Sequence, residues 1–306
     1  MNDDHRWVAC LVAAVMLCGL AWSVSMPTSG NFAQFTGRAF ATTYKVTYAY
    51  GPDVEAVQLA VQEELDRIDA MASTWRDDSE LMRYNHAADP GTFKLSQELA
   101  DLIERAQQIE VQTGGAFSLR PDGRGIDLSA IAKGYAVDRV AELMQNRFGI
   151  TDALVDIGGE VRGFGDGPKG DGWRVGLYTP QDIPSSVAAQ THLQLHNTSI
   201  ATSGDSFKGD HLLDPATGQP VANDLCSASV IQPSNATADA YATALYVMGH
   251  DRGLAWAKEN GAQVVFLLRD GTRREHVPDK VIGRSTALSQ ASHLPEIAEQ
   301  MAAAPF

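Results

Sequence analysis

The chain has very little cysteine. Only three of its 306 residues are cysteines, and two of these, Cys10 and Cys18, lie in an apolar stretch near the N-terminus. Cys226 is therefore the only cysteine in the rest of the chain, which excludes an internal disulfide there. With 44% hydrophobic and 20% charged residues, the chain must rely on a hydrophobic core, built as one large domain or two small ones.

Positive charge is also scarce. Lysine and arginine number 24 against 38 aspartates and glutamates, which gives a formal net charge of -14. The basic residues form no cluster larger than the pair Arg273-Arg274, which argues against a nucleic-acid-binding surface, so we expect no nucleic acid as a partner. An acidic protein that binds an anionic ligand needs local compensation, from a helix N-terminus, an isolated lysine or a divalent cation.

Several familiar catalytic motifs are missing. The chain contains no Walker loop and no Gly-x-Ser-x-Gly elbow, and Ser129 and Lys133 are one residue too far apart for a Ser-x-x-Lys motif. Its eight histidines include no His-Glu-x-x-His, which argues against a zinc enzyme.

The N-terminus carries one long uncharged stretch. Residues 7–26 are mostly apolar, follow Arg6, and precede a Pro-Thr-Ser-Gly sequence. This length suits an export signal or a single membrane anchor. We therefore expect residues 1–30 to be a leader or anchor and residues 31–306 to form one exported domain, which predicts a periplasmic location.

Hydrophobic periodicity predicts helices interleaved with strands and hairpins. A Gly158-Gly159 turn between two apolar runs indicates a β-hairpin. Expected helices cover residues 54–71, 96–112, the segment from Lys133 to about Arg147, 237–248 and 252–260, and expected strands cover 38–50, 153–157, 160–164, 173–178, 192–195, 227–232 and 262–268. This order favours an α+β architecture of mixed or antiparallel sheets with packed helices over a doubly wound parallel sheet.

A lysine stands in the first turn of a predicted helix. Lys133 opposes the helix dipole there, whereas the free N–H groups suit a bound phosphate or carboxylate. Gly134 removes a side chain that would block a close approach. The alternative is a solvated lysine on an ordinary helix start, capped by Asp127 or Ser129. Local physics alone does not separate the two interpretations.

Three other segments offer groups for binding or catalysis. Trp75 is either a platform for a flat ring or a tryptophan of the core or a lid. The turn at residues 113–117 either points backbone N–H groups at a ligand or simply ends a helix. His211, surrounded by hydroxyls and a glycine, is a candidate general base near neutral pH.

A fourth segment offers oxygen ligands for a metal. Asp239 and Thr243 are four residues apart, so a helix places both on one face, and both are hard ligands suited to Mg²⁺ or Ca²⁺. The alternative is that Asp239 serves the first turn of a helix capped by Thr237.

Taken in order, seven segments resemble the FAD:protein FMN transferase family, known as ApbE. They are residues 73–85 (Ser-Thr-Trp-Arg to Asn), 113–117 (Thr-Gly-Gly-Ala-Phe), 127–138, 155–159 (Val-Asp-Ile-Gly-Gly), 202–205 (Thr-Ser-Gly-Asp), 211–220 and 238–243. The resemblance implies a T-fold-related single catalytic domain. It also implies cleavage of FAD at its pyrophosphate, attachment of FMN through a phosphoester to a Ser or Thr of a partner protein, and release of AMP.

The resemblance also implies roles for individual residues. Trp75 would stack on a ring of FAD, and the other expected FAD contacts are Phe40, Ala116, Phe117, Ser118, Asp127, Lys133 and Leu212. Mg²⁺ would be held by Asp239, Thr243 and the backbone carbonyl of Ala130. Lys133 would position FAD, and His211 would deprotonate the acceptor hydroxyl.

The chain departs from the family pattern in three places. Ser118 replaces the usual Asp after Ala-Phe, and Phe40-Ala41-Thr42 replaces a common Met-Gly-Thr. Only residues 118–126 separate the Ala-Phe turn from the lysine segment, where relatives usually carry a long insertion. This short form resembles the NosX branch that accompanies nitrous oxide reductase, which implies a membrane flavoprotein as the acceptor. The alternatives are a non-catalytic FAD-binding or flavin-delivery protein and a structural accessory subunit of a respiratory complex.

Overall fold

The fold is built on one antiparallel sheet. The computed structural model describes residues 24–25, 32–177, 192–204 and 212–277. Nine strands form the sheet in the order β1-β2-β3-β4-β5-β8-β11-β12-β13, and every neighbouring pair is antiparallel. The strands are β1 (Val24–Ser25), β2 (Phe32–Ala39), β3 (Thr42–Ala49), β4 (Ala153–Ile157), β5 (Glu160–Phe164), β8 (Thr198–Gly204), β11 (Leu225–Gln232), β12 (Gln263–Leu268) and β13 (Arg273–His276).

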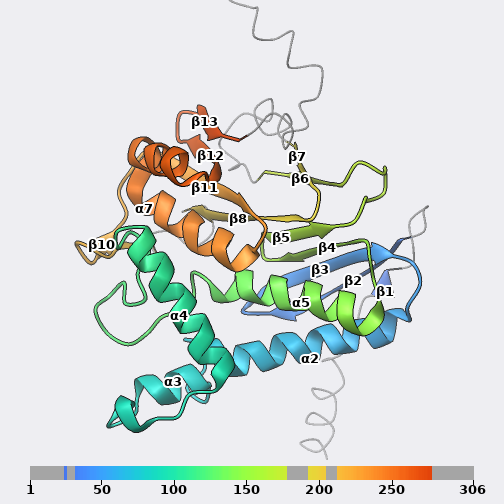
Figure 1. Ribbon diagram of the computed structural model, residues 1–306, viewed down its shortest axis with the longest axis horizontal. Helices are drawn as coiled ribbons and strands as arrows, with labels where there is room; N and C mark the ends of the chain where they lie inside the picture. The colour runs from blue at the N-terminus through green and yellow to red at the C-terminus, as the bar shows by residue number, and fades with distance from the viewer. Residues whose placement is uncertain (1–23, 26–31, 178–191, 205–211, 278–306) are drawn as a thin grey trace, which may run out of the picture.

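Helices cover one face of this sheet (Figure 1). The helices on the sheet are α2 (Val54–Ala72), α5 (Ala132–Phe148) and α7 (Asn235–Asn260). Two further helices pack on these, α3 (Glu80–Asn85) on α2 and α4 (Gln97–Gln112) on α7, and a short 3₁₀ turn spans Pro90–Thr92. Helix α2 packs on β2, α5 on β4 and β5, and α7 on β8 and β11. The α+β class predicted from the sequence is confirmed.

Two small hairpins complete the described structure. Strands β6 (Trp173–Gly176) and β7 (His192–Leu195) form one, and β9 (Leu213–Asp214) and β10 (Gln219–Pro220) form the other. Trp173 of the first hairpin belongs to the same buried cluster as Val161 and Ile200. Because side chains alternate along a strand, Val161 and its neighbour Glu160 point to opposite faces of the sheet. Glu160 thus points to the helical face.

The predicted strand at residues 38–50 is wrong in its first part. Arg38 and Ala39 end β2, and β3 begins at Thr42 after a two-residue turn. Phe40 and Ala41 in this turn have φ values of 50° and 57°, the left-handed conformation of a tight hairpin. Neither residue is a glycine or asparagine, so the sequence carried no signal for the turn.

The other predicted elements agree closely with the structure. The β4–β5 hairpin has the predicted bounds, and α2 and α4 differ from prediction by one residue. The two helices expected near the C-terminal part are a single assigned helix, α7, kinked at Gly249 with φ 76° and ψ 170°. Tyr178, expected at the end of a strand, lies outside the described residues.

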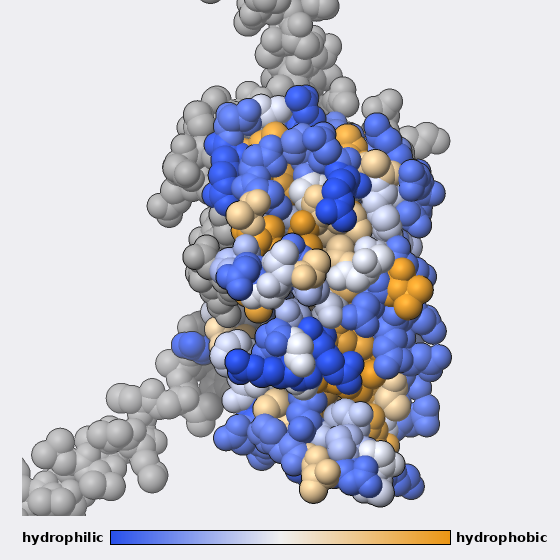
Figure 2. Space-filling model, turned by 90° about the vertical axis from the view of Figure 1, so that its left-hand side faces the viewer, coloured by the Kyte–Doolittle hydropathy of each residue, from blue (hydrophilic) through white to orange (hydrophobic). Residues whose placement is uncertain are grey.

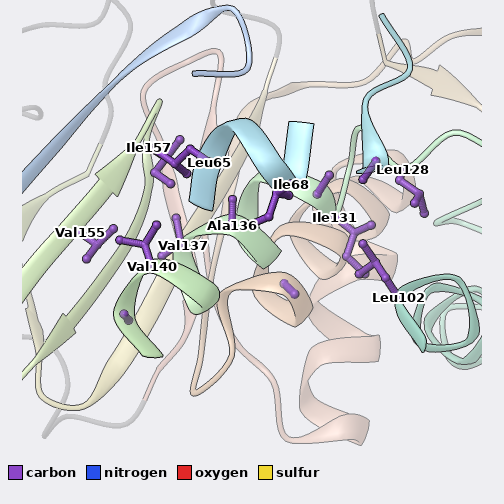
Figure 3. Close-up of a cluster of buried hydrophobic side chains, with 14 of the residues drawn as sticks. Leu65, Ile68, Leu102, Leu128, Ile131, Ala136, Val137, Val140, Val155 and Ile157 are labelled. Carbon is purple, nitrogen blue, oxygen red and sulfur yellow. The ribbon is translucent and has the colours of Figure 1, made fainter. Parts of the chain in front are cut away.

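A hydrophobic core fixes the start of α5 (Figure 3). Leu65 and Ile68 of α2 and Leu102 of α4 are buried around this helix. Leu128 and Ile131, just before α5, are 0% exposed in the same core. The start of α5 is therefore held in place by the buried residues that precede it and by the side chains of α2 and α4 around it.

The described part of the chain holds no helix long and apolar enough to cross a bilayer. The expected leader or anchor falls outside the described residues except for β1, in which Val24 pairs with Phe35 of β2. One side of the molecule carries mainly hydrophilic residues with apolar ones scattered among them (Figure 2). Among the described residues, the large apolar side chains that stand exposed are Tyr50, Leu59, Trp75 and Val111.

Candidate functional site

Three elements distant in sequence bring charged groups together at the start of strand β5, a central strand of the sheet. Lys133 in the first turn of α5 forms an ion pair with Glu160, the first residue of β5. Asp239 in the second turn of α7 accepts a hydrogen bond at 3.0 Å from the backbone N–H of Gly134. Lys133, Glu160 and Asp239 are called the charged cluster below. Glu160 lies 27 positions after Lys133 in the chain, and Asp239 lies 105 positions after Gly134.

The start of α5 has no side-chain cap. Its N-cap residue is Ile131, which makes no capping hydrogen bond. Asp127 accepts instead from the N–H of Ser129 at 2.8 Å, and the Ser129 hydroxyl bonds with the Thr74 hydroxyl at 2.9 Å. The expected alternative, in which Asp127 or Ser129 caps an ordinary helix start, is therefore wrong.

Lys133 is not a solvated surface lysine. Its side chain is 32% exposed, and its ammonium group is held by a glutamate that is 1% exposed. Burial by itself lowers the pKa of Lys133, but the carboxylates of Glu160 and Asp239 raise it by more, so the net shift is upward. The lysine is therefore charged throughout the physiological pH range.

The two carboxylates of the charged cluster are buried. The pKa of Glu160 is raised to about 8, chiefly by burial and also by the nearby Asp239, while Lys133 and a hydrogen bond from the backbone of Thr202 act in the opposite direction. Burial also raises the pKa of Asp239, against the opposing effects of Lys133 and the Gly134 N–H. One ammonium group therefore faces two carboxylates, and oxygen Oε2 of Glu160 has no hydrogen-bond partner among the described residues. Once the pH exceeds these raised pKa values and both carboxylates are ionised, the charged cluster carries one more negative than positive charge.

Gly134 allows α5 and α7 to touch. A Cβ atom at this position would lie 2.4 Å from the carbonyl oxygen of Asn235 and 2.8 Å from Cβ of Asp239. The sequence suggested a close approach of a bound anion at Gly134, but in the structure helix α7 makes this approach. Any side chain at this position would push Asp239 away from the first turn of α5.

Asp239 does not serve the end of its own helix. Helix α7 begins at Asn235 after the cap Ser234, whose hydroxyl accepts from the N–H of Thr237 at 3.4 Å. The interpretation in which Thr237 caps the helix and Asp239 supports its first turn is therefore wrong. The carboxylate of Asp239 faces α5, and the hydroxyl of Thr243, one turn later, bonds with Ser203 of β8 at 3.0 Å.

Asp138 of α5 fixes the start of α7. Its carboxylate accepts from the N–H groups of Asn235 and Ala236, at 2.9 and 3.1 Å, and from the Ser234 hydroxyl at 2.6 Å. It also pairs with Arg162 of β5 at 2.5 Å. The carboxylate thus satisfies free donors of the helix terminus and sets the position of α7 relative to α5.

The turn after α4 is a helix C-cap. Gly114 and Gly115 have φ values of 61° and 83°, and their N–H groups donate to carbonyls in the last turn of α4, while the N–H of Ala116 donates to the carbonyl of Thr113. The N–H of Phe117 donates to the Thr113 hydroxyl at 3.2 Å. The expectation of free N–H groups facing a ligand is wrong here, because the turn itself uses them all.

The expected FAD contacts are exposed to very different degrees. Trp75 is 85% exposed, which excludes the core interpretation and leaves its ring accessible. Phe117 is 1% and Ala116 9% exposed, so the Phe117 side chain belongs to the core. Phe40 occupies the β2–β3 turn, next to the β4–β5 turn, where Gly158 donates to the carbonyl of Thr43 at 3.0 Å.

The remaining expected site residues lie in loops. Ser118 is half-buried, and its hydroxyl accepts from the N–H of Arg120 at 3.1 Å. Ala130 is half-buried in the turn before α5, and Leu212 packs beside the core under α7. His211 lies outside the described residues. The binding and catalytic roles expected for all these positions stay predictions.

The described ranges contain no group of three or more His, Cys, Asp or Glu arranged to hold a metal. The ligand set expected from the sequence has only one carboxylate, Asp239, with a hydroxyl and a backbone carbonyl. One oxygen of that carboxylate is engaged by Gly134. The negative excess of the charged cluster and its hard oxygen atoms suit a small divalent cation.

Sequence reasoning missed two residues of this region. Glu160 follows directly after Gly158-Gly159, and a charged residue on the buried face of a strand was the available signal. Ser203 belongs to the Thr-Ser-Gly-Asp segment at residues 202–205, but the sequence did not indicate that its hydroxyl, on β8, contacts Thr243 of α7. Sequence spacing alone cannot predict a contact between residues 40 positions apart.

Solved structures share this arrangement of sheet and helices. A flavin transferase ApbE from Vibrio cholerae superposes with a TM-score of 0.72 at 28% identity, covering 81% of this chain and 97% of that one. The apo form of the Pseudomonas stutzeri flavinyl transferase ApbE superposes with a TM-score of 0.71 at 26% identity, covering 82% and 97%. The fold is therefore that of the flavin transferases.

Sequence comparison gives the family itself. The profile of the ApbE family matches residues 40–122 and 118–266. A protein of Klebsiella pneumoniae named FAD:protein FMN transferase is 29% identical over 327 aligned positions, covering 86% of this chain and 92% of the relative. The chain belongs to the ApbE family.

Proposed function

We propose that this protein is an FAD:protein FMN transferase. It cleaves the pyrophosphate of FAD, attaches FMN through a phosphoester to a Ser or Thr hydroxyl of an acceptor protein, and releases AMP. The observation that carries the proposal is the charged cluster, a lysine and two buried carboxylates at the start of α5, in a chain that belongs to the ApbE family. A buried site with both charges offers a cation for the pyrophosphate and anionic ligands for a metal.

The residues present fit Mg²⁺. Asp239 and Thr243 supply a carboxylate and a hydroxyl from successive turns of α7, and the carbonyl of Ala130 is our third expected ligand. When both carboxylates are ionised, they outnumber the single ammonium group of Lys133, which favours a cation over a neutral occupant. When bound, Mg²⁺ offsets the negative charge that builds up on the pyrophosphate.

The remaining steps fall to the chain's own side chains. Lys133 orients the pyrophosphate, and the exposed ring of Trp75 stacks on a ring of FAD. His211 accepts the proton of the acceptor hydroxyl as its oxygen bonds to the phosphorus of the FMN moiety. The bond from that phosphorus to the AMP moiety breaks in the same displacement, and AMP leaves with the electron pair.

Location and acceptor are inferred from the sequence. The apolar N-terminal segment supports a periplasmic enzyme, with that segment as export signal or anchor. The short connection between Phe117 and Asp127 supports the NosX branch, with a membrane flavoprotein that serves nitrous oxide reductase as acceptor.

The test is covalent flavinylation of an acceptor. Purified protein is incubated with FAD, Mg²⁺ and an acceptor domain that a relative flavinylates, and the acceptor is analysed by in-gel flavin fluorescence after denaturation and by mass spectrometry. We expect a mass increase of one esterified FMN. Absence of covalent FMN on the acceptor under every metal condition would refute the proposal that the protein is a transferase. FAD binding without transfer would indicate a flavin-delivery protein, and no FAD binding at all would favour a structural subunit.

A matched pair of variants tests the metal site within the same assay. Asp239→Asn removes a buried carboxylate of α7, and we expect it to abolish Mg²⁺-dependent transfer while the protein stays folded. Asp251→Asn makes the same chemical change on the same helix, at a side chain that is 93% exposed, and should transfer at the wild-type rate. Equal activity of the two variants would show that Asp239 is not a metal ligand.

A further inference from the structure

We infer that Glu160 is a positioning residue, which holds the ammonium group of Lys133 away from Asp239 and so keeps Asp239 available to a divalent cation. This inference rests on the proposed function of the site. It concerns a residue to which the sequence assigned no role.

Within the charged cluster, Lys133 pairs with one of the two carboxylates and not with the other. Lys133 makes its ion pair with Glu160, and no oxygen of Asp239 lies within ion-pair distance of its nitrogen. The hydrogen bond of Asp239 comes instead from the backbone N–H of Gly134. Lys133 nevertheless lies near enough to Asp239 to influence its pKa. Glu160 is therefore the group that fixes where the ammonium charge sits between two carboxylates.

Glu160 is costly as a structural residue. It is 1% exposed, and its oxygen Oε2 has no hydrogen-bond partner among the described residues. A carboxylate buried in this way costs free energy, and an ion pair that served stability alone would satisfy both oxygens. Glu160 also begins strand β5 directly after Gly158 and Gly159, at a position facing α5 where an apolar side chain could pack. A role in fixing the position of the Lys133 ammonium group would explain why a buried carboxylate is present at this position.

Removing the charge of Glu160 has two consequences for a bound cation. The cluster loses its excess of negative charge, and Asp239 becomes the nearest carboxylate for Lys133. Both effects weaken cation binding at Asp239. Removing Lys133 as well restores the negative excess and frees Asp239 again. The two substitutions should therefore compensate each other, which a purely structural role of Glu160 would not produce.

The experiment measures metal binding without FAD. Mn²⁺, as the probe, is titrated into wild-type protein, Glu160→Gln, Lys133→Met and the double variant at pH 8, and free Mn²⁺ is followed by electron paramagnetic resonance. We expect Glu160→Gln to raise the Kd for Mn²⁺ by about tenfold or more, Lys133→Met to lower it, and the double variant to return within about threefold of wild type. Glu142→Gln on the exposed side of α5 removes one carboxylate as a matched control and should leave the Kd unchanged.

The outcomes separate this inference from the proposed function. A Glu160→Gln protein that binds Mn²⁺ like wild type, or a double variant no better than Glu160→Gln, would overturn the positioning role. Absence of saturable Mn²⁺ binding by wild type would also overturn it. In each case flavinylation by wild type would still support the transferase. If Glu160→Gln does not fold, Glu160→Asp replaces it, because it retains the charge on a shorter side chain. The inference then requires that Glu160→Asp raises the Kd for Mn²⁺ and that adding Lys133→Met restores this Kd.

Discussion

Substitution of Gly134 by alanine tests how α5 and α7 position Asp239. The added Cβ would lie 2.4 Å from the carbonyl oxygen of Asn235 and 2.7 Å from its carbonyl carbon. An ordinary van der Waals contact to these atoms is about 3.4 Å or more, so the two helices must separate by about 1 Å. The hydrogen bond from Gly134 to Asp239, now 3.0 Å, would lengthen with them.

Two opposing effects set the stability of Gly134→Ala. Alanine gains about 1 kcal/mol over glycine within a helix, whereas overpacking of a close-packed contact costs about 1–3 kcal/mol. Because backbone atoms cannot rotate away as a side chain can, we expect the upper part of that range and a net loss of about 1–2 kcal/mol. A domain of this size should then unfold about 2–8 °C lower.

The activity should fall by more than the stability. A displacement of about 1 Å in a catalytic group can cost about a hundredfold in rate, so kcat for flavin transfer should drop by that order. Thermal unfolding and single-turnover transfer are measured together with Gly51→Ala, a control because nothing lies within 4 Å of a Cβ added there. A Gly134→Ala protein as stable and active as wild type would refute the close-packing argument, since helix propensity alone predicts stabilisation.

Three further predictions follow from the contacts of the described residues. Asp138→Ala removes the carboxylate that accepts from the backbone N–H groups at the start of α7 and pairs with the partly buried Arg162, and we expect a loss of about 3 kcal/mol in urea unfolding; a loss below about 1 kcal/mol would contradict this. The pKa of Glu98 is lowered, chiefly by its hydrogen bond to Arg67, so its contribution to stability is present above its unfolded pKa and is lost as the pH falls through the lower folded pKa. The stability difference between wild type and Glu98→Gln, at most about 1 kcal/mol for an exposed pair, should therefore shrink in acid unfolding series, and a difference that grows in acid would refute the assignment. Lys133→Ala should raise the Kd for FAD, measured by flavin fluorescence, by a larger factor than it lowers the single-turnover rate at saturating FAD, and the reverse ratio would place Lys133 in the chemical step.

Much of the fold could be predicted because its signals are local. The apolar periodicity of α2 and α4 gave their bounds to within one residue, and Gly158-Gly159 marked the β4–β5 turn. The turn at Phe40-Ala41 could not be predicted, since its positive φ values are imposed by strand pairing on residues that do not favour them. The kink of α7 at Gly249 appeared in the sequence as a break between two helices.

The candidate site was predicted only in part. The sequence singled out Lys133 and Asp239 by type and spacing, and the structure brings both to the start of strand β5. It did not predict Glu160, because a single buried acid on a strand has no pattern of its own. The free N–H groups expected at residues 114–117 are used within the turn, an outcome decided by φ values that the glycines permit but do not dictate.

The sequence by itself determined the main helices, the β4–β5 hairpin, the α+β class, and the position of a lysine in the first turn of a helix. These properties depend on neighbours within a few residues, which periodicity and turn residues report directly. Only the tertiary structure decided that Lys133 pairs with Glu160 and that Gly134 makes room for α7. Glu160 lies 27 positions after Lys133 in the chain, and Asp239 lies 105 positions after Gly134. Ion pairing and steric exclusion act through space, so the spacing of residues along the chain does not report such contacts.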